Sequence, residues 1–306
     1  MRKAKKPRVK SSAARTLAVV LGIVALLCAY LWATGFFRVP EDDYETVLKT
    51  IEAAAAERKD SAHFGLSGAD ENTVRQVLSD AAGNGPLGIY SKKTTDAMLA
   101  LNRYAVDLGS CSYKTITSDS VGARKSVTSV HLAYYLSETQ VAAADKIASR
   151  VAKKARKIRG KRQRLRYLHD RVVLNSAYEG AASSKWHNAP HYGVSASAVN
   201  SCSAAQLVAH RGMCNSYALT YLRLCRAADI GSDLRYVGCV VKGGASPDHA
   251  LVAAKLDGKW RYIDVTWDDP LYTSPAGAEY ERADAVSHEY FLKSRSFMVK
   301  TGHKLG

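Results

Sequence analysis

Sequence signatures of several common functional classes are missing from this chain of 306 residues. It contains no Cys-x-x-Cys pair, no cysteine–histidine cluster with zinc spacing and no recognisable calcium-binding loop. We therefore expect neither a cofactor nor a structural metal ion. The chain also lacks internal repeats and low-complexity segments, and its 47% of hydrophobic residues is typical of a globular protein. This composition excludes a mainly disordered or collagen-like chain.

Acidic residues are missing from residues 1–37, which contain seven lysines and arginines. A second basic segment, residues 145–171, holds twelve basic and two acidic side chains, so the rest of the chain is close to neutral. The formal net charge of +16 is therefore local and does not predict nucleic-acid binding. A solvated helix face explains the second segment. The alternative is that residues 146–166 contact anionic wall polymers or phospholipid headgroups.

Residues Thr16–Phe37 form an uncharged run of 22 residues that is rich in leucine, valine, isoleucine and alanine. A helix of that length can cross a hydrocarbon core of about 30 Å, whereas the apolar core of a signal peptide has only about 7–15 residues. We therefore predict an uncleaved single-pass anchor in the cell membrane. The basic flank, residues 1–15, is expected in the cytoplasm, which makes residues 38–306 extracytoplasmic.

The extracytoplasmic part is expected to contain two domains, a helical one at residues 38–140 and a second one at residues 141–306. Apolar residues recur at helical spacing within residues 41–58, which indicates the first helix of this part. Two capping-box patterns predict further helix starts, at Ser137 with Gln140 and at Ser203 with Gln206.

A helix with a single apolar stripe is predicted between Gly212 and Gly231, because glycines mark helix ends. Cys214 lies in its first turn, where the positive end of the helix dipole and unpaired backbone N–H groups favour the thiolate. The thiolate is the nucleophilic form of cysteine, so Cys214 is a candidate nucleophile. Cys225 lies three turns further along the same stripe and is expected in the core. The sequence leaves open whether a disulfide forms among Cys111, Cys202 and Cys239.

The dipeptide Asp257-Gly258 lies between two strand-like runs and is a strong signal for a two-residue β-hairpin. With this turn and no bulge, His249 and Asp264 become diagonal neighbours on one face of the hairpin. A carboxylate in that position fixes the tautomer of a histidine whose other ring nitrogen activates a thiol. The alternative interpretation is an ordinary cross-strand polar pair.

Two stretches, GMCNSYA at residues 212–218 and DHALVAAKLDGKWRYIDVTWDDP at residues 248–270, resemble the transglutaminase-like superfamily, which has a papain-like core. Residues 167–179 and 288–294 are similar to segments that bacterial members carry before the cysteine and at the end of the domain. The resemblance covers about residues 140–306. It implies an α+β fold in which a cysteine-bearing helix packs on an antiparallel sheet, here preceded by a helical domain and a transmembrane helix.

The resemblance also assigns roles to three residues. Carried over by position, Cys214 is the nucleophile, His249 is the general base and acid, and Asp264 orients the histidine. The chain departs from the family at Asn215, where many members have glutamine. Besides the backbone N–H of Cys214, the candidates for an oxyanion contact or the edge of the site are Gln206, Asn215 and Trp267.

The remaining polar residues near these motifs are expected to be structural. Asp268 and Asp269 are expected to cap a turn before Pro270, and Gln206 has an alternative explanation in its capping box. Structural roles are also expected for four histidines, His169, His210, His288 and His303.

The function that this reading implies is acyl transfer from a peptide or amide substrate through a thioester on Cys214. Water is the default acceptor, so we expect a cysteine peptidase or amidase that acts on a protein or peptide, with cell-wall peptides among the candidates. Attack by an amine would instead give transglutaminase-type cross-linking. A third possibility is a non-catalytic module that binds the cell surface or wall.

Overall fold

The computed structural model describes most of the chain beyond residue 43. The predicted cytoplasmic tail and the predicted membrane anchor, residues Thr16–Phe37, lie outside the described residues. Among the described residues, no helix is both long and apolar enough to cross a bilayer. The described ranges are residues 44–64, 71–114, 117–120, 123–126, 129–179, 193–241, 243, 246–269 and 286–306.

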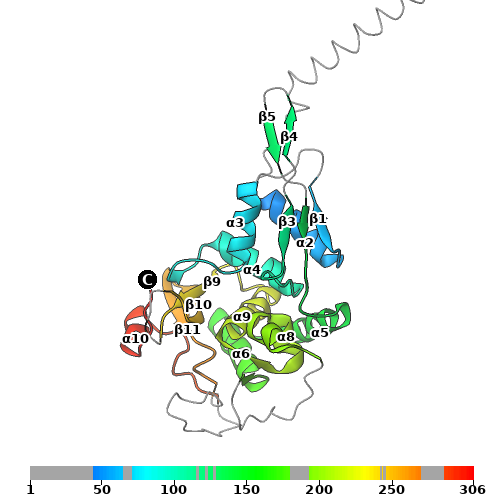
Figure 1. The fold of residues 1–306 in the computed structure, drawn as a ribbon. Coiled ribbons are helices and arrows are strands. Elements are labelled where there is room, and N and C mark those ends of the chain that lie inside the picture. Colours follow the sequence, from blue (N-terminus) through cyan, green and yellow to red (C-terminus); the bar gives the residue numbers. More distant parts are fainter. Residues whose placement is uncertain are drawn as a thin grey trace, which may run out of the picture.

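The described residues of the N-terminal part form three helices and a small antiparallel sheet (Figure 1). The expectation of a helical domain at residues 38–140 is therefore incomplete. The strands of this sheet have only three residues each, too few to show alternation in the sequence. A separate hairpin joins two further strands. The elements are α2 (Tyr44–Ala56), β1 (Ser61–His63), α3 (Glu71–Ala81), α4 (Lys92–Arg103), β3 (Ser112–Lys114), β4 (Thr117–Ser120), β5 (Ala123–Ser126) and β6 (Ser129–His131).

The C-terminal part places a group of helices beside a four-stranded sheet (Figure 1). Its first helix starts at the predicted capping box, since Ser137 Oγ accepts from the backbone of Gln140 and the Gln140 side chain accepts from the backbone of Ser137. The helices are α5 (Glu138–Ala155), α6 (Lys161–Leu174), α7 (Ala196–Ser201), α8 (Ser203–Ala209), α9 (Cys214–Ala227) and α10 (Arg295–Lys300), and the short parallel pair β7 (Ala177–Tyr178) and β8 (Arg211–Gly212) lies among them.

The four-stranded sheet has the order β11-β10-β9-β2 and is antiparallel throughout. Its hairpin confirms the predicted register, with Leu256 opposite Lys259. Asp257 and Gly258 both have positive φ, 48° and 75°, as a two-residue type I′ turn requires. The strands are β2 (Gly88–Ile89), β9 (Leu234–Cys239), β10 (His249–Leu256) and β11 (Lys259–Ile263).

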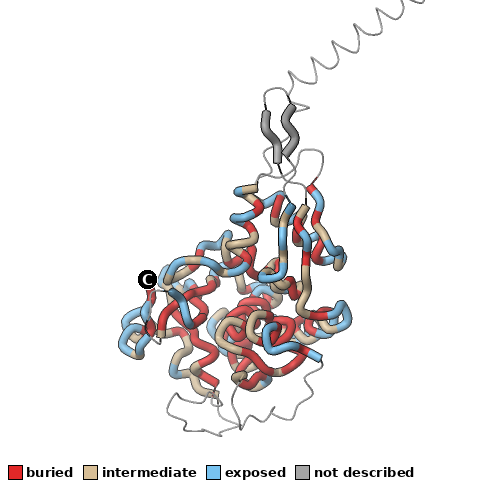
Figure 2. The backbone as a smooth tube through the Cα atoms, viewed as in Figure 1, coloured by how far each residue is buried: buried red, intermediate tan, exposed pale blue. Residues whose placement is uncertain are grey.

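The two faces of this sheet contact different helices, because side chains alternate along each strand. Ala250 and Val252 join the large core that contains α9, whereas Leu251 and Ala253 pack with Met298 of α10. Figure 2 shows that buried residues continue from α8 and α9 into the strands of the sheet. His249 and Leu251 are two residues apart on β10, so their side chains lie on the same face of the sheet. This is the face that packs against the C-terminal segment.

All five cysteines within the described residues are unpaired, so none of the disulfides that the sequence left open is present among them. Cys225 is fully buried, as predicted for a core residue of α9. The remaining cysteines are Cys111, Cys202, Cys214 and Cys239.

Candidate active site

Cys214 is the first residue of α9, directly after the N-cap residue Met213. The backbone N–H of Met213 donates to Ser216 Oγ at 3.0 Å, which closes the first turn. Gly212 makes this entry possible, since a Cβ there would lie 2.4 Å from Ser216 Oγ. The thiol therefore lies at the positive end of the helix, where backbone N–H groups have no partner within the helix.

His249 and Asp264 meet at the ends of the two strands that form the hairpin. His249 begins β10, and Asp264 directly follows β11. The distance from His249 Nε2 to Asp264 Oδ2 is 2.7 Å, and both residues are buried. The Cys214 thiol also interacts with His249, since it is among the groups that raise the pKa of the ring. Because Asp264 occupies Nε2, Nδ1 is the ring nitrogen left for the thiol.

The Asp264 carboxylate accepts four hydrogen bonds. Oδ1 accepts from the backbone N–H groups of Thr266 and Trp267, at 3.0 and 3.1 Å. Oδ2 is shared by His249 and by Nε2 of His303, which lies 3.0 Å away. Burial alone would raise the pKa of Asp264, but the charges and hydrogen bonds of the two histidines hold it well below its usual range.

The pKa of His249 is controlled by the same pair. Burial alone would lower it, whereas the charge and hydrogen bond of Asp264, together with those of Cys214, raise the pKa of His249 to about 10. At neutral pH the ring is therefore an imidazolium that lies beside a thiol. An imidazolium beside a cysteine is the pairing found at nucleophilic thiols, which attack carbonyl carbon as thiolates.

Trp267 and Asn215, two of the predicted site-edge residues, lie close to this centre. The Trp267 ring lies 5.7 Å from the His249 ring, measured between centroids. Asn215 directly follows Cys214, and its Oδ1 accepts from the Tyr236 hydroxyl at 2.9 Å. That contact fixes the side chain of Asn215 and leaves its oxyanion role a prediction.

Gln206 does not form the predicted capping box. The N-cap residue of α8 is Cys202, which makes no side-chain cap. The Gln206 amide is buried instead, where Nε2 donates to Ser176 Oγ and Oε1 accepts from Thr220 Oγ1, both at 2.8 Å. These bonds use one amide proton, so the oxyanion role of Gln206 remains a prediction that rests on the other.

Asp268 and Asp269 are buried and bind distant segments, in contrast to the expected turn cap. Asp268 Oδ1 accepts from the backbone of Tyr290, and its Oδ2 is 3.0 Å from His169 Nε2. Asp269 Oδ2 accepts from the Tyr217 hydroxyl at 2.6 Å. The two carboxylates therefore tie the segment after Asp264 to α6, to α9 and to residues near the C-terminus.

Three of the four histidines that were expected to be structural have contacts that fit such a role. His169 is fully buried, and although burial alone would lower its pKa, hydrogen bonds to Asp170 and Asp268 raise it. His288 bonds Asp170 at 2.7 Å, and His210 lies 2.9 Å from the carbonyl of Asn175. His303 is the exception, because it contacts Asp264.

Within the part of the chain that the structure describes, two groups of side chains bring three metal-ligating atoms within 4.8 Å of one another. One consists of His169, Asp170 and His288, and the other of His249, Asp264 and His303. In each group one carboxylate oxygen already contacts both imidazoles. A metal would have to displace the protons of these hydrogen bonds, so the geometry is that of hydrogen-bonded clusters.

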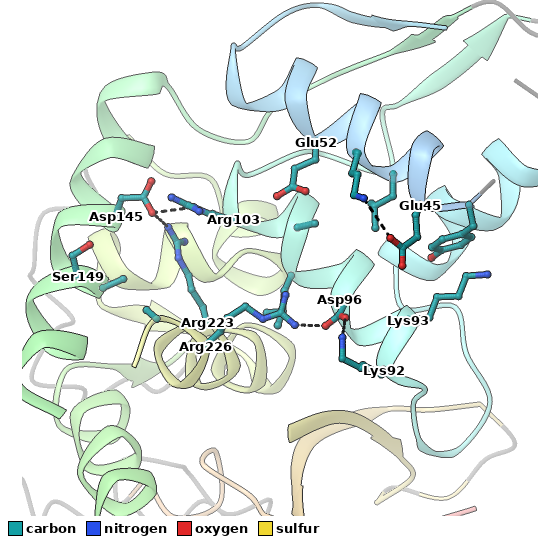
Figure 3. A pocket seen from close by; sticks show the side chains of 17 residues that line it. Glu45, Glu52, Lys92, Lys93, Asp96, Arg103, Asp145, Ser149, Arg223 and Arg226 are labelled. Atoms are coloured by element: carbon teal, nitrogen blue, oxygen red, sulfur yellow. Dashed lines mark hydrogen bonds and ion pairs between the residues drawn. The ribbon is translucent and has the colours of Figure 1, made fainter. Parts of the chain in front are cut away.

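A large cavity of about 890 Å³ lies elsewhere, between α2, α4, α5 and α9 (Figure 3). Its lining residues on α9 include Arg223 and Arg226, and Arg223 is about 13.5 Å along the helix from Cys214 at 1.5 Å per residue. Ion pairs cross its wall, from Arg226 to Asp96 and from Arg223 to Asp145. The cavity is thus separate from the candidate active site.

Comparison with known proteins gives only distant similarity. No family model and no curated protein matches the chain. One similar structure is a candidate cysteine protease from Cytophaga hutchinsonii, with 16% identity and a TM-score of 0.30, covering 52% of this chain and 64% of that one. Another is a transglutaminase, with 16% identity and a TM-score of 0.31, covering 72% and 62%.

The chain therefore aligns with less than two thirds of the length of either structure. It has an α+β fold with antiparallel sheets that is distantly similar to a transglutaminase and a cysteine protease. The similarity concerns the fold, and the chemistry has to be argued from the residues of this chain.

Proposed function

We propose that this protein is a thiol acyl-transfer enzyme that cleaves peptide or amide bonds, with Cys214 as nucleophile, His249 as base and acid, and Asp264 as orienting carboxylate. One observation carries the proposal: His249 bonds the Asp264 carboxylate at 2.7 Å, and Cys214 is among the groups that raise the pKa of this histidine. Cys214 begins the helix α9, and the histidine beside it is an imidazolium at neutral pH. A histidine–carboxylate pair with only a structural role would need no thiol beside the second ring nitrogen of the histidine.

The reaction starts from the thiolate–imidazolium pair. The Cys214 sulfur attacks the carbonyl carbon, and the oxyanion that forms faces the backbone N–H of Cys214 at the start of α9. The Nδ1 proton of His249 goes to the leaving amine as the carbon–nitrogen bond breaks, which leaves a thioester on Cys214. His249 then takes a proton from water, whose oxygen attacks the thioester, and the acid and the thiol are released.

Asp264 makes these proton transfers possible because it keeps Nε2 of His249 protonated and Nδ1 directed at the sulfur. The Trp267 ring packs beside the imidazole and restricts its rotation. Both groups therefore hold the geometry that the transfer requires at the moment of reaction.

The proposal also includes a location and a partner. Residues Thr16–Phe37 anchor the protein in the cell membrane, and the catalytic part acts outside on proteins or peptides such as those of the cell wall. The helices α5 and α6 support a second contact with anionic polymers or headgroups. The exposed basic side chains of these helices and of the turn between them are Lys146, Arg150, Lys153, Lys154, Arg156, Lys157, Arg159, Arg162 and Arg166.

Salt dependence tests the basic contact. Binding of the full chain to polyphosphate or to phosphatidylglycerol vesicles should weaken as the salt concentration rises from about 50 to about 500 mM. The reason is that screening reduces the attraction between exposed charges. Replacing Lys153, Lys154 and Lys157 by glutamine should weaken it further. Binding that is independent of salt would show that these helices have only a solvated face.

The chemistry is tested by trapping the acyl-enzyme. The full chain in mild detergent is incubated with a library of glutamine-containing peptides and a primary amine, and intact mass spectrometry follows adducts on Cys214. Formation of acyl-Cys214 and of hydrolysed peptide is expected, and both should disappear in Cys214→Ala and persist in Cys111→Ala. Turnover that survives Cys214→Ala would contradict the proposal, and amine conjugates as the main product would indicate cross-linking.

A further inference from the structure

A second histidine reaches the carboxylate of the triad from the end of the chain. His303 Nε2 lies 3.0 Å from Asp264 Oδ2, the same oxygen that contacts His249 at 2.7 Å. His303 is fully buried. We propose that His303 is a positioning residue that holds the Asp264 carboxylate in the orientation in which it bonds His249. This inference rests on the proposed function.

The direction of the hydrogen bond follows from the groups involved. An ionised carboxylate oxygen can only accept, so His303 Nε2 carries a proton and donates it. The other anchors of Asp264 are two backbone N–H groups, and both act on Oδ1. His303 is thus the donor besides His249 that fixes Oδ2, the oxygen on which the catalytic imidazole depends.

Two features of the backbone position His303 beside Asp264. Gly302 has a φ of 102°, which lets the chain reverse after α10, and the N–H of His303 then donates to the carbonyl of Met298 at 3.0 Å. Lys304 next pairs with Val240 through two backbone hydrogen bonds, of 2.8 and 3.2 Å. Val240 directly follows β9, whose last residue opposes His249.

Two aromatic rings pack against the His303 imidazole. The Trp267 ring lies 4.2 Å from it between centroids, and the Tyr290 ring lies 5.8 Å away. Trp267 contacts His249 as well, so both histidines and the carboxylate form one packed unit. At the far side of the ring, Nδ1 is 3.2 Å from the carbonyl of Met298.

A matched pair of substitutions separates the hydrogen bond from the packing. His303→Gln keeps an N–H donor at about the place of Nε2, whereas His303→Met has a similar size and no donor. A hydrogen bond to a charged group contributes about 1.5–3 kcal/mol, which corresponds to about 10- to 100-fold in rate. If the bond positions Asp264, that fraction of reactivity should be lost in the methionine variant and largely restored in the glutamine variant.

The readout is the rate constant for alkylation of Cys214 by iodoacetamide at about pH 6, resolved by site with mass spectrometry in the full chain. We expect a fall of about 10- to 100-fold for His303→Met and less than about threefold for His303→Gln. His169→Met is the control for stability, because it removes another buried histidine bonded to carboxylates while leaving Asp264 untouched. Its melting temperature should fall while the rate for the folded protein is kept.

The outcomes separate this inference from the proposed function. Wild-type Cys214 that reacts slowly would contradict the proposed function, whatever the variants do. If Cys214 of the wild type reacts fast and His303→Met reacts equally fast, the role of His303 is overturned and the proposed function stands. The same holds if His303→Met and His303→Gln lose the same fraction of the rate. If His303→Met does not fold, ¹⁵N NMR of histidine-labelled wild type decides: we expect a protonated, slowly exchanging Nε2 on His303, and an unprotonated Nε2 would overturn the inference.

Discussion

At the scale of single residues, the site depends on how Asp264 is solvated by the protein. A buried carboxylate is costly unless donors replace the water that it loses. Here two backbone N–H groups and two imidazoles supply four hydrogen bonds, so the charge is kept in the interior. That charge in turn raises the pKa of His249 to about 10 and keeps a proton beside the thiol.

The raised pKa of His249 predicts how stability depends on pH. Between its ordinary value of 6.5 and about 10, the folded protein binds a proton that the unfolded chain has lost, so stability falls as the pH rises through this window. The effect is best measured in Cys214→Ser, where no thiol titrates at the site. Urea midpoints of Cys214→Ser should decline from about pH 6.5 toward pH 10 relative to those of Cys214→Ser/His249→Gln. Parallel curves for the two proteins would contradict the assignment.

At the scale of elements, the site is made by the ends of α9, β10 and β11. The hairpin could be predicted because a two-residue turn at Asp257-Gly258 fixes the register, and that register makes His249 and Asp264 neighbours. Cys214 could be placed because Gly212 precedes a long apolar stripe. The strands β1 and β3 were missed, since three residues carry no readable period.

The start of α9 depends on a close approach at Gly212. An alanine Cβ there would lie 2.4 Å from Ser216 Oγ and 3.0 Å from Gln206 Cδ, so Gly212→Ala should destabilise the fold by about 1–3 kcal/mol. Gly109→Ala is the matched control, because its Cβ would meet only a side-chain oxygen at 3.5 Å. Urea unfolding of the two variants measures the difference, and equal stabilities would show that the first turn adjusts freely.

At the scale of the whole molecule, segments far apart in the sequence are tied together around the site. His303 lies 39 residues beyond Asp264, and its contact depends on a turn and a backbone bridge that leave no pattern in the sequence. The same holds for Asp268, whose partner His169 lies on α6. Sequence patterns report local periodicity and turns, so the meeting of His249 and Asp264 could be predicted from them, and the contacts of His303 and Asp268 could not.

The N-terminal and C-terminal parts are joined by charged contacts at the cavity in Figure 3. Asp145 of α5 accepts from Arg223 of α9 at 3.0 Å and from Arg103 of α4 at 3.3 Å. Arg223 is buried, and breaking a buried pair costs about 3–5 kcal/mol, but Asp145 is partly exposed. We therefore expect Asp145→Ala to destabilise the protein by about 1–3 kcal/mol in urea unfolding.

The control for this prediction is the exposed ion pair of Lys59 with Glu57. Glu57→Ala removes that pair without uncovering a buried charge, so its urea midpoint should stay close to that of the wild type. Two variants with the same midpoint would mean that Asp145 does not stabilise the contact between α4, α5 and α9.

The central claim is that His249 keeps Cys214 in a reactive state, and site-resolved alkylation of the full chain across pH tests it most directly. Burial raises the pKa of Cys111, Cys202, Cys225 and Cys239, so these thiols should react slowly below about pH 7. Cys214 should be modified first at about pH 6, and His249→Ala should slow it by at least about tenfold. A Cys214 that reacts no faster than Cys111, or that is unaffected by the loss of His249, would contradict the account.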